Sequence, residues 1–153
     1  HIDQSLFARN ILDEKNGPPP EINLFNEKNN GETLLKLIDA GYIKSAHDVS
    51  IGGIITAVSK MCIIGKKGVT LKKPNYLINK FEYLFGEDQG RYIIEIDKNN
   101  LKKVIKILSE NSVHFDELGT INGDNLVIDD KSKVSIDDLI KSHTIWLTNY
   151  MSK

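Results

Sequence analysis

The spacing of hydrophobic and polar residues predicts helices that alternate with strands. Apolar residues recur every three or four positions in three stretches, which is typical of helices with one buried face. The predicted faces comprise Leu34, Leu35, Leu37 and Ile38, then Ile54, Ile55, Val58, Met61 and Cys62, then Leu101, Val104, Ile105 and Leu108. Ala40-Gly41 and Gly65 follow the first two faces and are typical helix ends. Another helix is predicted from Tyr76 to Leu84.

Short apolar runs between these helices predict strands at Ile43–Val49, Val69–Leu71 and Tyr92–Ile96. Leu118–Ile121 and Leu126–Ile128 flank Asn122-Gly123-Asp124-Asn125, a turn sequence that predicts a β-hairpin. Ser135 with Asp137 and Asp138 predicts the capped start of a last helix, which runs through Trp146. The expected class is therefore α+β in layers, with a mixed β-sheet covered by helices.

The first 22 residues depart from this pattern. Gly17-Pro18-Pro19-Pro20 favours an extended backbone, and its neighbours are polar. The chain also begins at His1 without an initiator methionine. We therefore expect residues 1–22 to be an extended arm from a missing upstream domain, and residues 23–153 to be the folded domain. A proline-rich ligand for a partner is the alternative role of the arm.

Composition and charge narrow the class further. The chain has 153 residues, 40% hydrophobic and 27% charged, which predicts a single soluble globular domain. Its net charge of -1 and its scattered aromatic residues favour neither nucleic acid nor an anionic membrane as a partner. No apolar run reaches the roughly 18 residues of a membrane span. The single cysteine, Cys62, cannot form a disulfide within the chain and is expected to be buried, as suits a reducing cytoplasm.

Two polar segments interrupt the apolar pattern and could carry chemistry. The first is Ser45–Ile54, where a strand passes through His47, Asp48 and Ser50 into Gly52 and Gly53. Glycines let a backbone approach a ligand, and the helix that follows offers unpaired N–H groups to an anion. The alternative is structural: Asp48 or Ser50 caps the helix, and His47 satisfies a carbonyl. A P-loop is excluded, because its lysine and hydroxyl are absent.

The second segment is Leu84–Tyr92, which places Glu87, Asp88 and Gln89 between two glycines. These side chains could accept hydrogen bonds from sugar hydroxyls or amines, or hold a hydrated Mg²⁺. Arg91 could bind a phosphate or pair with Glu87. The sequence contains no His/Cys cluster with metal-ligand spacing and no serine nucleophile elbow. A His/Cys metal site and a serine nucleophile are therefore excluded.

Together the two segments resemble a known family. SAHDVSIGGIITAVSKM, followed by LFGEDQGR, is similar to the carboxy-terminal domain shared by relatives of aminoimidazole ribonucleotide synthase. Within that superfamily the pattern resembles the large subunit of the phosphoribosylformylglycinamidine synthases. The segment from Gly17 to Leu24, the turn at Ala40–Ile43, Gly119-Thr120-Ile121 and Trp146 extend the likeness over nearly the whole chain.

The resemblance implies an ATP-dependent C–N ligase of purine biosynthesis in the cytoplasm. In that family formylglycinamide ribonucleotide, ATP and glutamine-derived ammonia give formylglycinamidine ribonucleotide. ATP activates the amide oxygen, and ammonia displaces the phosphate. ATP and Mg²⁺ are expected to bind mainly to domains outside this chain. The implied partners are the upstream domains of the same polypeptide, a glutaminase subunit and a small adaptor subunit.

The resemblance also implies that this domain is the second of two copies. In the first copy an acid-x-Gln tripeptide reaches the substrate, and Glu87, Asp88 and Gln89 match it here. Ile51 and Lys60 stand where the family commonly has acids, which favours a decayed site. We therefore expect a structural and auxiliary-site domain that is inactive alone, with no catalytic residue and no metal ligand. The alternatives are a non-catalytic module that scaffolds the glutaminase, and another superfamily member that uses ATP on a small phosphorylated substrate.

Overall fold

The computed structural model describes residues 1–74, 76, 78–129 and 132–152. The elements, in chain order, are α1 (Leu6–Asn10), α2 (Leu24–Asp39), β1 (Ile43–Asp48), α3 (Gly53–Gly65), β2 (Val69–Leu71), α4 (Lys80–Phe85), β3 (Tyr92–Ile96), the 3₁₀ turn η1 (Lys98–Asn100), α5 (Leu101–Glu110), β4 (Gly119–Ile121), β5 (Asn125–Val127), β6 (Lys133–Ser135) and α6 (Ile136–Met151). Residues 1–57 and 78–115 form one compact unit, and residues 58–77 and 116–153 form a second. The helices, together with a two-stranded antiparallel sheet and a four-stranded mixed sheet, confirm the α+β class.

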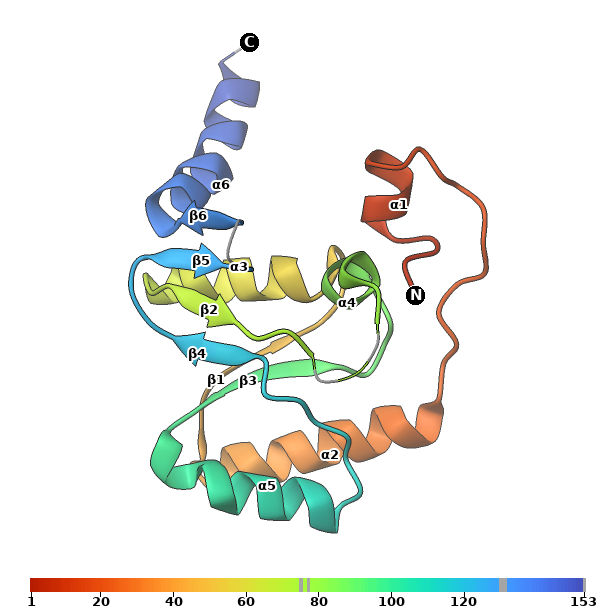
Figure 1. Ribbon diagram of the computed structural model, residues 1–153, viewed down its shortest axis with the longest axis vertical. Coiled ribbons are helices and arrows are strands. Elements are labelled where there is room, and N and C mark those ends of the chain that lie inside the picture. The colour runs from red at the N-terminus through yellow and green to blue at the C-terminus, as the bar shows by residue number, and fades with distance from the viewer. Residues whose placement is uncertain (75, 77, 130–131, 153) are drawn as a thin grey trace. The chain divides into compact units, whose positions relative to one another are not determined.

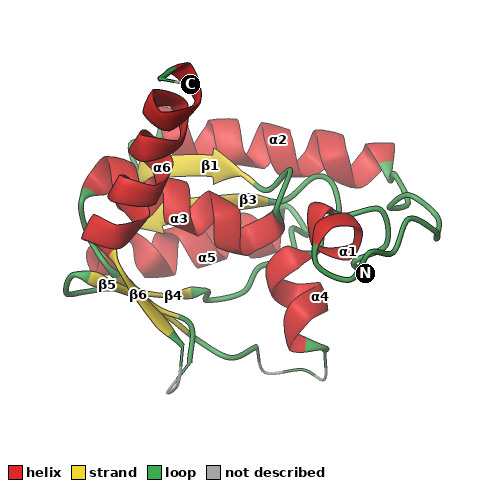
Figure 2. Cartoon of the chain, turned by 90° about the horizontal axis from the view of Figure 1, so that it is seen from above, coloured by secondary structure: helices red, strands yellow, loops and turns green. Residues whose placement is uncertain are grey.

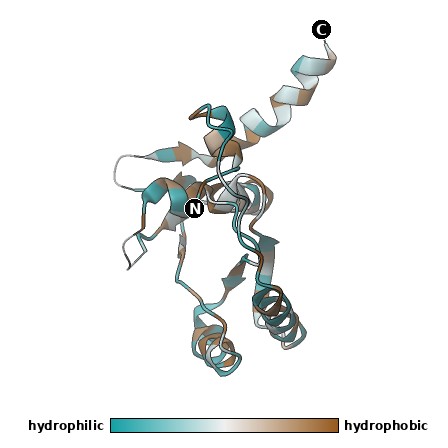
Figure 3. Ribbon diagram, turned by 90° about the vertical axis from the view of Figure 1, so that its right-hand side faces the viewer, coloured by the Kyte–Doolittle hydropathy of each residue, from teal (hydrophilic) through white to brown (hydrophobic). Residues whose placement is uncertain are grey.

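The first unit is built on an antiparallel ribbon of β1 and β3. Helices α2 and α5 lie side by side beneath this ribbon (Figure 1). Each helix buries one residue almost completely, since Leu37 and Val104 are both 1% exposed. The hydropathy colouring of the same two helices, at the bottom of Figure 3, alternates between hydrophilic and hydrophobic positions. The predicted faces therefore coincide with the core only in part, since other predicted members are exposed, namely Leu35, Ile38, Leu101 and Ile105.

Helix α2 ends as its sequence predicts. Gly41 has a positive φ of 68°, and its N–H donates to the carbonyl of Ile38 at 2.9 Å. The N–H of Tyr42 donates to the carbonyl of Leu37 at 3.1 Å, which completes a Schellman motif. The helix begins at Leu24, earlier than its apolar face indicates, because the side chain of Asn23 caps the N–H of Asn26 at 3.0 Å.

The amino-terminal segment is not extended throughout, which corrects the sequence-based expectation for residues 6–10. Ser5 accepts a hydrogen bond from the N–H of Ala8 at 3.2 Å and so caps the short helix α1. Phe7 stacks on Phe85 and Phe81, with ring centroids 4.4 and 5.4 Å away, and Figure 2 shows α1 beside α4. This aromatic contact stabilises a helix too short to persist alone. The role of residues 1–22 as a link to another domain stays a prediction.

The second unit contains a four-stranded mixed sheet in the order β4-β2-β5-β6. The predicted hairpin between β4 and β5 is wrong, because β2 lies between these two strands. Val69 of β2 pairs with Ile121 on its antiparallel side and with Leu126 on its parallel side. The turn at 122–124 is instead hydrogen-bonded to the residue before β2, because the N–H of Gly68 donates to the carbonyl of Gly123 at 2.8 Å.

Three further predictions concern α3, α4 and α6. Cys62 on α3 is 2% exposed, as expected. Ser135 caps α6 by accepting from the N–H of Asp138 at 3.0 Å, which confirms the predicted start of that helix. Helix α4 begins at Lys80 and not at Tyr76, because Asn79 caps the N–H of Phe81 at 2.8 Å; Leu77 lies outside the described residues. Among the described helices none is long and apolar enough to cross a membrane.

Candidate functional site

The two polar segments meet at one end of the β1–β3 ribbon. Asp48, the last residue of β1, pairs with Tyr92, the first residue of β3. The N–H of Val49 extends this ladder by donating to the carbonyl of Arg91 at 2.8 Å. Residues 49–53, the glycine loop, therefore lie beside residues 86–91, the acidic loop. Because β1 and β3 run antiparallel, the exit of one strand is next to the entry of the other.

Glu87 joins three segments of the chain. Its Oε1 atom accepts a hydrogen bond from the N–H of Gly52 at 2.9 Å and another from the N–H of Leu6 at 2.8 Å. Hydrogen bonds to an ionised carboxylate are stronger than neutral ones. This carboxylate therefore ties the glycine loop and α1 to the acidic loop, and one of its oxygens is already engaged by backbone.

Gly53 is required by close packing against the chain itself. Its φ is +69°, and a Cβ at this position would lie 2.6 Å from the carbonyl oxygen of Leu84 and 2.8 Å from that of Gly86. No side chain fits in that space, and only glycine adopts this φ freely. The close approach that this glycine permits is thus between the start of α3 and the end of α4.

Arg91 binds its own loop. Its guanidinium donates to the carbonyl of Gly86 at 2.7 Å and to the carbonyl of Asp88 at 3.0 Å. The same side chain forms an ion pair with the carboxylate of Asp88 at 3.6 Å. These bonds stabilise the acidic loop and reduce the capacity of Arg91 to bind a phosphate. A pairing of Arg91 with Glu87, one of the two roles considered from the sequence, stays a prediction.

His47 and Asp48 interact locally. The Nδ1 atom of His47 lies 2.6 Å from the backbone carbonyl of Asp48 and 3.3 Å from its carboxylate. A protonated Nδ1 would donate to that carbonyl, which is the structural role expected for this histidine. The carboxylate of Asp48 is 63% exposed and remains accessible to solvent.

A pocket of about 370 Å³ lies at this end of the ribbon, lined by Glu27, Asp48, Val49, Ser50, Ile51, Glu87, Gln89, Gly90, Arg91 and Tyr92. Five of the nine predicted residues line it: Asp48, Ser50, Glu87, Gln89 and Arg91. The other four, His47, Gly52, Gly53 and Asp88, are absent from that lining and support the two loops through the contacts above.

Sequence reasoning missed Glu27, which reaches the pocket from α2. Its only signal is an acid in the first turn of a helix, which is commonly a response to the helix dipole. Asn30, one turn later, donates from its side chain to the carbonyl of Gly90 at 2.9 Å and holds the acidic loop against α2. A contact between residues sixty positions apart leaves no local pattern in the sequence.

The chemistry of the lining favours ligands that donate hydrogen bonds. Asp48, Glu27 and Gln89 present acceptor oxygens, whereas the one cationic side chain in the lining, Arg91, is engaged by carbonyls and Asp88. Such a surface suits hydroxyl or amine groups better than phosphate. Within the described residues no group of three or more His, Cys, Asp or Glu side chains could hold a metal ion.

The candidate site thus consists of a glycine loop that opens a helix and an acidic loop that is hydrogen-bonded to it, at one end of an antiparallel ribbon in an α+β domain. Residues 4–131 match the family described as AIR synthase related protein, C-terminal domain, and the chain belongs to that family. The two motifs therefore identified the family correctly.

The curated relatives are much longer than this chain. The chain is 81% identical over 151 residues to phosphoribosylformylglycinamidine synthase subunit PurL of Pelagibacter ubique, which covers 99% of the chain and 21% of that protein. It is 38% identical over 151 residues to the PurL subunit of Bartonella bacilliformis, covering 99% of the chain and 20% of that protein. The chain thus spans about a fifth of the length of the curated relatives it matches.

Solved structures share the fold. T. maritima PurL complexed with FGAR superposes with a TM-score of 0.67 at 18% identity, over 78% of this chain and 21% of that one. The structure of PurLQS from Thermotoga maritima gives a TM-score of 0.67 at 19% identity, over 87% of this chain and 24% of that one. At these identities the likeness establishes the fold alone.

Proposed function

We propose that this chain is the carboxy-terminal domain of a phosphoribosylformylglycinamidine synthase subunit of the PurL type. The whole subunit would convert formylglycinamide ribonucleotide, ATP and glutamine-derived ammonia to formylglycinamidine ribonucleotide, as a C–N ligase of cytoplasmic purine biosynthesis. The observation that carries this proposal is the 81% identity over 151 residues to the Pelagibacter ubique subunit.

Within that enzyme the chain has a structural and auxiliary role. Glu87 and Arg91 are the strongest charged candidates for binding a ligand, but both form hydrogen bonds with backbone groups of this chain. Ile51, which is 65% exposed, places an apolar side chain at the pocket. A polar ligand would gain nothing from that side chain. These features support the proposal that ATP and Mg²⁺ bind mainly to the rest of the polypeptide.

The partners follow from the same identification. A Thermotoga maritima relative of this fold has been solved as PurLQS. We propose that the complete subunit that carries this chain likewise assembles with a glutaminase subunit and a small adaptor subunit. Ammonium salts would replace the glutaminase in an assay, because ammonia is the nucleophile.

The test measures ATP consumption with formylglycinamide ribonucleotide and ammonium. We expect turnover by the complete polypeptide and none by the 153-residue chain. Gln89→Ala in the complete polypeptide should change turnover by less than about threefold, since an auxiliary pocket does not stabilise the transition state. A loss of about 100-fold or more would instead give this pocket a catalytic role. An inactive complete polypeptide, folded and supplied with ammonium, would refute the synthase assignment.

A further inference from the structure

The last helix, α6, has no cover over most of its length. Ile136 at its first turn is 5% exposed, whereas every residue from Lys141 to Met151 is exposed. Figure 1 shows α6 leading away from β6 to the carboxyl end. Helices of this length are marginal in water unless an apolar face packs against something. The described part of the chain supplies no such surface beyond residue 141.

One side of α6 is apolar. Trp146, Leu147, Tyr150 and Met151 share a face of the helix, and they are 67%, 58%, 65% and 75% exposed. Trp146 and Tyr150 stack, with ring centroids 5.4 Å apart. Large aromatic side chains gathered on one exposed face are typical of an interaction surface.

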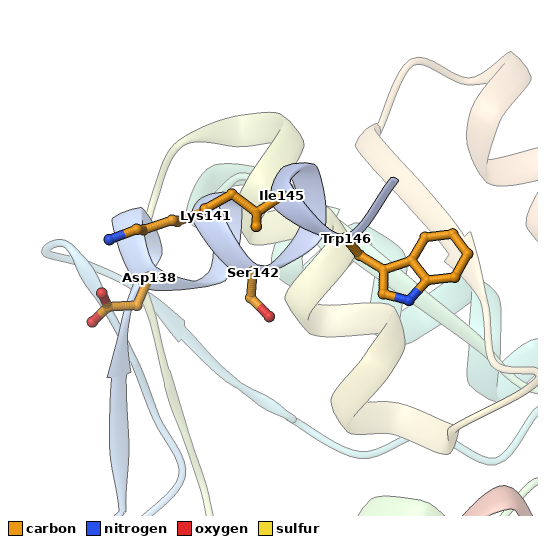
Figure 4. Close-up of a pocket in the computed structure, with 5 residues that line it drawn as sticks. All are labelled: Asp138, Lys141, Ser142, Ile145 and Trp146. Carbon is orange, nitrogen blue, oxygen red and sulfur yellow. The ribbon is translucent and has the colours of Figure 1, made fainter. Parts of the chain in front are cut away.

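A surface hollow of about 370 Å³ lies on the adjoining side of α6 and meets this face at Trp146. All five residues that line it, Asp138, Lys141, Ser142, Ile145 and Trp146, belong to α6 (Figure 4). Their side chains project from a single helix.

Most of the length of the curated relatives lies outside this chain. The match to the shared family domain ends at residue 131, before α6 begins. In contrast, the PurL subunit of Bartonella quintana matches over 153 residues, 100% of this chain, and the chain covers only 21% of that protein. Helix α6 is therefore present in the PurL-type relatives and lies outside the part of the chain that matches the family domain.

We propose that the apolar face of α6, formed by Trp146, Leu147, Tyr150 and Met151, docks onto another domain of the same polypeptide. This inference rests on the proposed function for one point only, that the chain is part of a longer subunit. The docked helix would fix this domain to the rest of the subunit. If a second copy of the subunit covered this face, its protection would depend on protein concentration. If a separate adaptor covered it, its protection would depend on added adaptor.

Hydrogen–deuterium exchange on the complete polypeptide tests the proposal. We expect the amides of residues 142–151 to be protected in the complete polypeptide without its partners, and equally protected when the protein is diluted about 100-fold. The double variant W146S/Y150S should speed their exchange by about tenfold or more. Serine has nearly the helix propensity of tryptophan and tyrosine, so the loss would report docking and not intrinsic helix formation.

The matched control is T148S/N149S, which changes the other face of the same helix and should leave exchange unchanged. Peptides from α5 should exchange alike in all three proteins, which shows that the domain stays folded. Protection that disappears on dilution would overturn the proposal in favour of a second copy. Protection that needs the glutaminase or adaptor, or fast exchange throughout, would also overturn it. Ammonium-dependent turnover of the unchanged polypeptide is measured alongside, so that a failed assignment of function is recognised separately.

Discussion

Gly53→Ala should destabilise the junction between the glycine loop and the acidic loop. The residue has a φ of +69°, a conformation that costs an alanine roughly 1–2 kcal/mol. The new Cβ would also lie 2.6 Å from the carbonyl oxygen of Leu84 and 2.8 Å from that of Gly86. Both neighbours are backbone atoms and cannot rotate away.

Relief of this clash requires α3 to move from the end of α4, an overpacking that typically costs about 1–3 kcal/mol. The two contributions together predict a loss of about 4 kcal/mol in the free energy of unfolding. For a urea dependence of about 2 kcal/mol per molar, the unfolding midpoint should fall by about 2 M.

Two other glycines separate the contributions. Gly41 has a φ of +68° and nothing within 4 Å of the added Cβ, so Gly41→Ala should show the backbone cost alone. Gly65 also has open space and no positive φ, so Gly65→Ala should be neutral or stabilising by up to about 1 kcal/mol. The assay is urea denaturation followed by circular dichroism. If Gly53→Ala loses no more than Gly41→Ala, the argument from close packing is wrong.

Three more predictions concern single side chains. Glu87→Ala should speed amide hydrogen exchange at both Gly52 and Leu6, because both N–H groups lose their acceptor. Glu87→Gln should retain most of the protection. A change at only one of the two amides would contradict the conclusion that Glu87 joins the glycine loop to α1. Burial raises the pKa of the Cys62 thiol above its ordinary value of 9.0, so the unfolded chain ionises first as the pH rises. The free energy of unfolding should therefore fall above pH 9.0 relative to that of Cys62→Ala, and parallel pH profiles for the two proteins would exclude this contribution. Thr33 is 1% exposed, and its hydroxyl finds no hydrogen-bond partner among the described residues, so Thr33→Val should raise the free energy of unfolding by about 1 kcal/mol in thermal denaturation; a loss of stability would indicate a hydrogen bond that the geometry does not show.

Local patterns predicted the local structure well. The cap at Ser135, the stop at Gly41 and the burial of Cys62 each depend on residues within one or two turns, and each is confirmed. The two loops of the candidate site were also found from their residues. The hydrogen bonds within that site were not predicted. They join Glu87 to Leu6 and Asn30 to Gly90, which are far apart in the sequence.

The predicted hairpin failed for a related reason. Asn122-Gly123-Asp124-Asn125 does form a tight turn, with φ of +55° at Gly123, but its two flanking strands pair with a third. A turn sequence specifies the reversal of the chain and leaves the choice of neighbours to packing. Position 68 requires glycine for β2 to enter between β4 and β5, because a Cβ there would lie 2.5 Å from the backbone nitrogen of Asn125.

The place of β2 in its sheet also determines an order of folding. Both neighbours of Val69, namely Ile121 and Leu126, are separated from it by the whole of the 78–115 segment. During synthesis one edge of β2 must remain unpaired until residue 121 has left the ribosome and the other until residue 127, whereas β1 and β3 can pair once residue 96 has emerged. Closing the longer loop costs more entropy and slows the step. The sheet of the second unit should therefore form last, and its exposed strand edges make that interval the stage at which a nascent chain is most prone to aggregate.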